Sequence, residues 1–278
     1  MATYPDNATS IAGASAGTVL DASTADGWGG SALEVGRFYA NVHGLRMHYL
    51  RQGAGPTVVL LHGGTYASEV CWKEAIPFLA EKFSVIAVDQ MGHGRTNDDP
   101  SRPFSYHEMA EDTIELLRQL GVQRASLVGW SDGGNIALDI AMNHASIVER
   151  LVTSGANFSV EGQDPSVHVS ADKFPGPSRD VYGKISPDGA EHWPIVLSRL
   201  RQMWATEPHW TREDLSRIQA PSLIIAGDAD NIRRAHTADL ARAIPGARLA
   251  ILPNATHFVV IDDPARWDTL VRNFLLGE

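Results

Sequence analysis

Length, composition and charge limit what this chain can be. It has 278 residues, 44% of them hydrophobic and 20% charged, with 23 Lys and Arg against 33 Asp and Glu, for a net charge of −10. This is the composition of an ordinary globular domain, which excludes a mainly disordered, collagen-like or coiled-coil chain. The acidic balance and the lack of a cluster of Lys and Arg argue against a nucleic-acid partner.

Membrane attachment and disulfide bonding are both disfavoured. No apolar run approaches the roughly 20 residues needed to cross a bilayer, and residues 1–20 contain no Lys or Arg before an apolar stretch. The single cysteine, Cys71, cannot form an internal disulfide, and we expect it to be a small buried hydrophobe. The sequence therefore predicts a cytoplasmic protein without a membrane partner.

The chain begins with a segment that has no periodic pattern. Residues 1–32 are rich in Ala, Ser, Thr and Gly, and we expect them to form a flexible arm. Two short strand-like runs, 36–42 and 46–51, then flank His43-Gly44. This arrangement predicts a β-hairpin.

Short apolar runs alternate with amphipathic stretches along the rest of the chain. The apolar runs predict strands at 57–61, 85–88, 126–129, 150–153, 223–226 and 249–252. The amphipathic stretches predict helices at 68–82, 105–120, 133–144, 235–244 and 264–276. The second of these helices opens with a capping box, Ser105 and Glu108, and ends at Gly121. Continuous apolar strands that alternate with helices predict the α/β class, a mostly parallel sheet with helices on both faces.

One segment interrupts this alternation. Residues 157–217 contain no buried-strand run and are rich in Pro, Trp and His. A structureless loop of that length is unusual in a compact domain, so we expect a small helical insertion with its main helix at 190–204. The core of the domain then comprises residues 33–156 and 218–278.

A G-x-S-x-G motif lies at the end of one predicted strand. Gly129-Trp130-Ser131-Asp132-Gly133 follows the apolar run and opens the next predicted helix. A tight strand-to-helix turn needs small residues at Gly129 and Gly133, and it leaves the Ser131 hydroxyl projecting above the sheet. We therefore expect Ser131 to be a nucleophile.

A serine nucleophile needs a base, and the base needs an acid to orient it. Two later predicted strands are followed by suitable residues, Asp230 and His257. The chain order Ser131, Asp230, His257 agrees with a strand-end triad. Asp228 is the alternative acid and would otherwise brace the loop, but the spacing of three from Gly227 favours Asp230.

Taken together, these motifs resemble those of α/β-hydrolase-fold proteins over residues 35–278. Two further motifs carry the resemblance: His62-Gly63-Gly64-Thr65 after the first predicted central strand, and an Asp-x-x-Gly-x-Gly turn that spans residues 89–94. The resemblance implies a mostly parallel sheet with a helical cap insertion over its catalytic face. The elbow, residues 129–134, is similar to that of biphenyl hydrolase-like and valacyclovir-type hydrolases, which implies a preference for esters with a small or amine-bearing acyl group.

The resemblance also implies an oxyanion hole. Its two donors would be the backbone amides of Gly64 and Asp132, with Thr65 as the alternative to Gly64. The Asp132 carboxylate has two interpretations. It can favour the positive end of the following helix, or it can face the substrate cavity and favour cationic or neutral substrates.

Aromatic residues of the insertion are candidates for substrate binding. Phe158, Trp193 and Trp204 would line an apolar pocket above Ser131, or they would form a small core within the cap itself. Met203, Trp210 and Phe174 belong to the same set. Among the other histidines, we expect His62 to be a structural hydrogen-bonding residue and His93 a turn residue.

The function that follows is a serine hydrolase that cleaves a small carboxylic ester through an acyl-enzyme intermediate, with no cofactor and no metal. A serine at the elbow argues against haloalkane dehalogenases and soluble epoxide hydrolases, which carry Asp there. A lactonase, an amidase or a carbon–carbon bond hydrolase would use the same triad. A non-catalytic small-ligand-binding protein is the alternative from another class, and a homodimer is compatible with the sequence.

Overall fold

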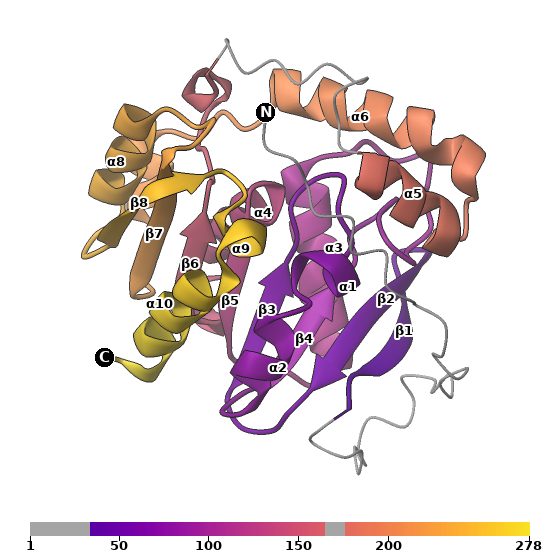
Figure 1. Cartoon of the computed structure of the whole chain (residues 1–278), viewed down its shortest axis with the longest axis horizontal. Coiled ribbons are helices and arrows are strands. Elements are labelled where there is room, and N and C mark those ends of the chain that lie inside the picture. The colour runs from indigo at the N-terminus through magenta and orange to yellow at the C-terminus, as the bar shows by residue number, and fades with distance from the viewer. Residues whose placement is uncertain (1–33, 165–175) are drawn as a thin grey trace.

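The computed structural model describes residues 34–164 and 176–278 (Figure 1). The expected arm at 1–32 and the candidate pocket residue Phe174 lie outside the described residues. In the described part of the chain, no helix has both the length and the apolar composition needed to cross a bilayer.

A single eight-stranded sheet forms the centre of the molecule. Its strands are β1 (Gly36–Val42), β2 (Leu45–Gln52), β3 (Thr57–Leu61), β4 (Ser84–Val88), β5 (Ala125–Trp130), β6 (Val148–Ser154), β7 (Ser222–Ala229) and β8 (Arg248–Thr256). Their order across the sheet is β1-β2-β4-β3-β5-β6-β7-β8. The predicted hairpin β1–β2 and the pair β2–β4 are antiparallel, and all the other neighbouring pairs are parallel. The predicted α/β class with a mostly parallel sheet is therefore confirmed.

Helices cover both faces of this sheet (Figure 1). They are α1 (Ser68–Cys71), α2 (Ala75–Ala80), α3 (Tyr106–Gln119), α4 (Asp132–Asn143), α5 (Gly176–Ile185), α6 (Trp193–Thr206), α7 (Arg212–Ser216), α8 (Arg234–Ala243), α9 (Val259–Asp262) and α10 (Pro264–Leu276). Successive side chains of β3 belong alternately to two separate hydrophobic cores. Val59 and Leu61 belong to the core under α3 and α4, whereas Val58 and Leu60 belong to the core under α2 and α10. Burial on both faces explains why the central strands are apolar throughout.

The helical insertion lies between β6 and β7. Its helices α5 and α6 extend across the sheet edge at which the parallel strands end (Figure 1). The main helix α6 begins at Trp193 after a 3₁₀ turn at Ala190–His192, so the helix predicted at 190–204 starts as a turn. Pro194 lies in the first turn of α6, where proline is tolerated.

The helix predicted at 68–82 is wrong as one continuous element. The structure has two short helices, α1 and α2, separated by a turn at residues 72–74. Pro77 has no N–H to donate to the carbonyl of Lys73 four residues earlier, so a continuous helical ladder cannot form there.

The capping box predicted at the start of α3 is also wrong. Ser105 occupies the cap position in an extended conformation, but its side chain makes no cap hydrogen bond. Glu108 instead contacts the Arg102 guanidinium at 3.1 Å, and the Tyr106 amide donates to the carboxylate of Glu207 at 3.0 Å. The carboxylate that follows α6 thus pairs with the first amide of α3.

Candidate active site

The candidate nucleophile lies on a sharp turn between β5 and α4. Ser131 has φ 54° and ψ −121°, a conformation that non-glycine residues rarely adopt. A Cβ at Gly129 would collide with the carbonyl of Gly133, and a Cβ at Gly133 would collide with the carbonyl of Leu61. The two glycines of the motif are thus required by close backbone contacts, and the strained turn directs Ser131 out of the sheet.

The structure brings Ser131, His257 and Asp230 into one chain of hydrogen bonds. His257 Nε2 lies 2.9 Å from Ser131 Oγ, and His257 Nδ1 lies 2.8 Å from an Asp230 carboxylate oxygen. Because an ionised carboxylate can only accept, Nδ1 carries the proton toward Asp230 and leaves Nε2 free to accept from the serine hydroxyl. This is the geometry of an activated serine.

Neighbouring parallel strands deliver the acid and the histidine. Asp230 directly follows β7 and His257 directly follows β8, so the two side chains leave the sheet at the same edge. The Asp230 carboxylate also accepts from the Ile232 amide at 2.9 Å, which holds the loop after β7. Asp228, the alternative acid, accepts instead from the Ala255 amide at 3.2 Å and braces β8.

Two contacts that the sequence analysis did not single out hold the histidine in place. The Trp130 indole N–H donates to the carbonyl of His257 at 2.8 Å. Gly155, at φ +63°, lies so close that a Cβ there would come within 2.7 Å of His257 Nδ1. Trp130 occupies a variable position of the motif, so its spacing gave no signal of this contact.

The loop after β3 carries the first candidate oxyanion donor. His62 Nδ1 donates to the carbonyl of Gly63 at 2.8 Å, and its Nε2 accepts from the Gln90 amide at 3.1 Å. Burial lowers the pKa of His62, which keeps the ring neutral for both bonds. His62 thus has the structural role expected of it, and it anchors the backbone that leads into Gly64.

The three candidate oxyanion amides are unpaired. Those of Gly64, Thr65 and Asp132 donate no hydrogen bond to any other residue in the described part of the chain. Thr65 has φ +68°, an outlier for a β-branched residue, so the loop is strained at this point. Gly64 and its alternative Thr65 both stay open as the partner of the Asp132 amide.

The Asp132 carboxylate is buried and joins α4 to α3 and to helix α6 of the insertion. The Trp204 indole N–H of α6 donates to both of its oxygens, at 2.8 and 3.0 Å, and the Tyr106 hydroxyl donates to one of them at 2.9 Å. Burial raises the pKa of Asp132, and these two donors with the nearby His257 counter part of that effect. Tyr106 was missed by the sequence analysis, because its position in the first turn of α3 carries no catalytic signature.

The aromatic candidates of the insertion pack against different partners. Trp204 bonds to Asp132, whereas Trp193 packs on Tyr182 with ring centroids 5.2 Å apart. Phe158 stacks on His236 of α8 at 4.0 Å. Met203 is buried in the core and Trp210 lies against the Tyr106 ring.

The two described segments, residues 34–164 and 176–278, contain no cluster of metal ligands. No group of three or more His, Cys, Asp or Glu side chains there could hold an ion. Cys71 is buried as expected, and burial raises the pKa of its thiol well above the usual value.

Comparison with known proteins places this geometry in context. The model of the Alpha/beta hydrolase family matches residues 58–268. Serine hydrolase BPHL of Mus musculus is 29% identical over 248 residues, which cover 84% of each chain.

Two solved structures have the same fold. The enol-lactonase from Burkholderia xenovorans LB400 superposes with a TM-score of 0.68 at 26% identity, covering 86% of this chain and 99% of that one. A meta-cleavage product hydrolase from Pseudomonas fluorescens IP01 superposes with a TM-score of 0.70 at 21% identity, covering 85% of this chain and 96% of that one. The second likeness shows the fold alone.

Proposed function

The chain belongs to the alpha/beta hydrolase family, and from that premise we propose that it is a serine hydrolase that cleaves a small carboxylic ester. The observation that carries the proposal is the hydrogen-bond chain from Ser131 through His257 to Asp230, with distances of 2.9 and 2.8 Å. The serine-hydrolase relative in mouse, matched over 84% of this chain, supports the same reaction class.

The proposed reaction begins with acylation. Ser131 Oγ attacks the ester carbonyl carbon while its proton passes to His257 Nε2, and Asp230 stabilises the resulting imidazolium. The amides of Asp132 and of Gly64 or Thr65 hold the tetrahedral oxyanion. The carbon–oxygen bond to the alcohol then breaks, and the alcohol leaves with the proton from Nε2.

Deacylation repeats these steps with water. His257 Nε2 takes a proton from water as its oxygen attacks the acyl carbon. Collapse of the second tetrahedral intermediate returns the proton to Ser131 Oγ and releases the carboxylic acid. In this proposal residues 157–217 act as the cap over the site, and the protein works in the cytoplasm on a small molecule.

The Asp132 carboxylate supports an acyl group that is neutral or carries an amine. Its hydrogen-bond donors, Tyr106 and Trp204, are both neutral, so an ionised Asp132 leaves negative charge beside the nucleophile. An acyl carboxylate would be repelled there and an ammonium group attracted. Asp132→Asn tests this contribution through the ratio of rates on amine-bearing and neutral esters.

The experiment that tests the proposed function compares wild type with Ser131→Ala. Initial rates are measured on p-nitrophenyl acetate, butyrate and octanoate, and on an α-amino ester. We expect the wild type to prefer the short or amine-bearing acyl groups and the variant to lose about 10⁴-fold or more of its kcat/KM. A variant that retained the wild-type rate would refute the proposal.

Ring opening of a lactone is the second candidate. It is favoured by the likeness to the enol-lactonase, which covers 86% of this chain at 26% identity. A lactone contains the same ester bond, so the triad and the oxyanion amides would act unchanged. A wild-type protein that cleaves lactones and none of the open-chain esters would favour this candidate.

A further inference from the structure

One buried side chain, Trp130, directly precedes the proposed nucleophile in the chain. It is the last residue of β5, and its backbone is held by parallel pairing with Ser154 of β6. Only 1% of Trp130 is exposed, so its side chain cannot touch a substrate. Any effect of Trp130 on the proposed reaction must therefore act through the residues that it contacts.

Trp130 contacts the loop that carries the proposed base. Its indole N–H donates to the carbonyl of His257 at 2.8 Å, and the two ring centroids lie 5.7 Å apart. The Phe258 ring packs edge-on against the same indole at 5.7 Å. The Asp230 carboxylate pairs with Nδ1 of the His257 ring, which holds only the end of that side chain. The hydrogen bond from Trp130 holds its main chain.

The same indole contacts the loop that carries the first candidate oxyanion donor. A Cβ at Gly63 would come within 2.9 Å of Trp130 Cε3 and within 3.2 Å of Ser131 Cβ, so the Gly63 backbone packs against both residues. The Tyr66 ring packs edge-on against Trp130 with centroids 5.0 Å apart. Because Gly64 lies between Gly63 and Tyr66, the backbone that presents its amide is held against Trp130 both before and after it.

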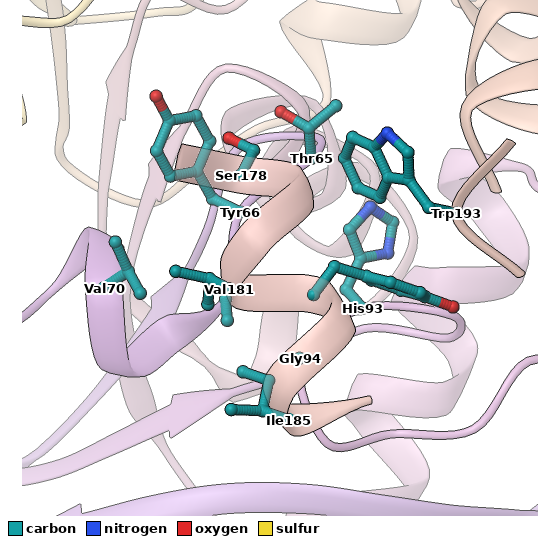
Figure 2. Close-up of a pocket in the computed structure, with 11 residues that line it drawn as sticks. Thr65, Tyr66, Val70, His93, Gly94, Ser178, Val181, Ile185 and Trp193 are labelled. Atoms are coloured by element: carbon teal, nitrogen blue, oxygen red, sulfur yellow. The ribbon is translucent and has the colours of Figure 1, made fainter. Parts of the chain in front are cut away.

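The loop also borders a pocket under α5. Thr65 and Tyr66 line this pocket together with Val181 and Ile185 of α5, and its volume is about 30 Å³ (Figure 2). A side chain that borders open space shifts more easily than one that is packed against a buried ring. Trp130 is therefore a firmer support for the loop than the cap helix on the other side of the pocket.

We propose that Trp130 is a positioning residue, which holds the proposed base and the candidate oxyanion donor in place relative to Ser131. The inference rests on the proposed function and adds to it a residue that has no catalytic group of its own. The reaction needs His257 Nε2 and the oxyanion amide at fixed places around one carbonyl group, and a displacement of about 1 Å can cost about 10²-fold in rate. One rigid indole in contact with both loops sets both placements.

Trp130→Phe tests the proposal, because it removes the N–H and shrinks the ring system but keeps an aromatic side chain. We expect kcat on p-nitrophenyl acetate to fall about 10- to 100-fold and KM to change by less than about threefold, since acylation and deacylation both use the displaced groups. Trp72→Phe is the matched control. Trp72 is fully buried in the same hydrophobic core, and among the described residues its indole N–H has no hydrogen-bond partner. This control should keep kcat within about twofold of wild type.

The rate and the final extent of labelling by a fluorophosphonate probe distinguish positioning from misfolding. For a positioning role, we expect Trp130→Phe to reach the same extent of labelling as wild type, but about 10-fold or more slowly. A purely structural role predicts the reverse, with fewer labelled chains that react at the wild-type rate. Peptide mass spectrometry identifies Ser131 as the labelled residue.

A subtler replacement keeps the test valid if Trp130→Phe does not fold. Benzothienylalanine at position 130 has the shape of tryptophan but carries sulfur in place of the N–H, so it removes the hydrogen bond to His257 and keeps the ring contacts. We expect labelling to be about three- to tenfold slower than in wild type, as for the loss of one hydrogen bond that orients the base. The same replacement at position 72 should leave the labelling rate unchanged.

The outcomes separate the positioning role from the proposed function. Equal losses of kcat in Trp130→Phe and Trp72→Phe, or wild-type labelling rates with benzothienylalanine at position 130, would overturn the positioning role alone. A wild type that neither hydrolyses the esters nor reacts with the probe would refute the proposed hydrolase function itself.

Discussion

The turn that carries the proposed nucleophile and the proposed cap, residues 157–217, meet at one residue, Asp132, but different kinds of contact build them. The turn is fixed by main-chain packing, since Gly129 and Gly133 lie against backbone carbonyls that leave no room for a Cβ. The cap is held by side chains: Trp204 donates to Asp132, Glu207 accepts from the Tyr106 amide, and His192 contacts Asp98 at 2.8 Å. Backbone packing permits almost no substitution, whereas side-chain contacts can be exchanged singly. The proposed reaction therefore depends on the rigid turn, and the proposed selectivity depends on the cap, whose contacts can be exchanged.

The largest expected effect concerns the proposed triad and distinguishes the two carboxylates at the end of β7, Asp228 and Asp230. Asp230→Asn should lower kcat/KM by about 10⁴-fold, because the amide would no longer orient and stabilise the His257 imidazolium. Asp228→Asn makes the same change two residues away, where the side chain braces Ala255. It should alter kcat/KM by only a few-fold. Steady-state kinetics on p-nitrophenyl acetate measure both, and equal losses in the two variants would contradict the assignment.

Stability tests the claim that the turn has no free space. Gly133→Ala places a methyl group against the Leu61 and His62 carbonyls, and we expect a loss of roughly 3 kcal/mol or more in the free energy of unfolding. Gly246→Ala is the matched control, with φ +71° and nothing within 4 Å of its added Cβ. Its left-handed conformation should cost about 1 kcal/mol. Urea denaturation of both variants gives the comparison. Similar losses of stability would mean that close packing is not the reason why glycine is required at position 133.

For the side-chain contacts that hold the cap, we expect a smaller loss in the free energy of unfolding. Trp204→Phe keeps an aromatic ring but removes the N–H that donates to both Asp132 oxygens, so the free energy of unfolding should fall by about 1–3 kcal/mol. Trp210→Phe, at a ring that packs on Tyr106, should cost less than about 1 kcal/mol. Denaturant midpoints give the comparison. A Trp204 variant as stable as its control would show that the bond to Asp132 does not hold the cap.

The smallest expected effect is a pH dependence where the cap leaves the core. His236 stacks under Phe158, and burial followed by the charge of Arg233 lowers its pKa to about 4. The unfolded chain binds a proton near pH 6.5 and the folded chain does not, so folding should lose stability as pH falls from about 6.5 toward 4. Because the ring is half-buried, His236→Gln should remove about 1–2 kcal/mol of this dependence.

His107 gives the opposite sign as an internal control for that measurement. A hydrogen bond to Asp139 raises its pKa, so its contribution is fully present below about pH 6.5 and is lost as pH rises through the folded pKa. Thermal unfolding of wild type, His236→Gln and His107→Gln across pH 4 to 8 separates the two. A pH profile that is unchanged in His236→Gln would rule out this role.

The contrast between backbone packing and side-chain contacts also explains which parts of the fold and of the candidate site could be predicted from the sequence. The strand ends that carry Ser131, Asp230 and His257 were predictable, because apolar runs mark the strands and parallel strands end at one edge. The choice between Asp228 and Asp230 followed from spacing alone, and the hydrogen bond to His257 lies at Asp230. These are local features of the chain.

Contacts between distant residues were beyond the sequence. Trp204 and Asp132 are 72 residues apart, and no spacing rule joins a cap helix to the first residue of α4. The amide of Tyr106 is a second case, since it donates to Glu207, which lies 101 residues further along the chain. Pattern-based prediction therefore identified the candidate triad and left open which cap residues surround it.

The most direct test of the central claim is to trap the acyl-enzyme. Wild-type protein is mixed with p-nitrophenyl acetate, quenched in acid during the first turnover, digested and analysed by mass spectrometry. Our account predicts one acetyl group on the peptide that contains Ser131 and none in Ser131→Ala. Turnover without an acetylated Ser131, or acetylation at another residue such as Cys71, would contradict it.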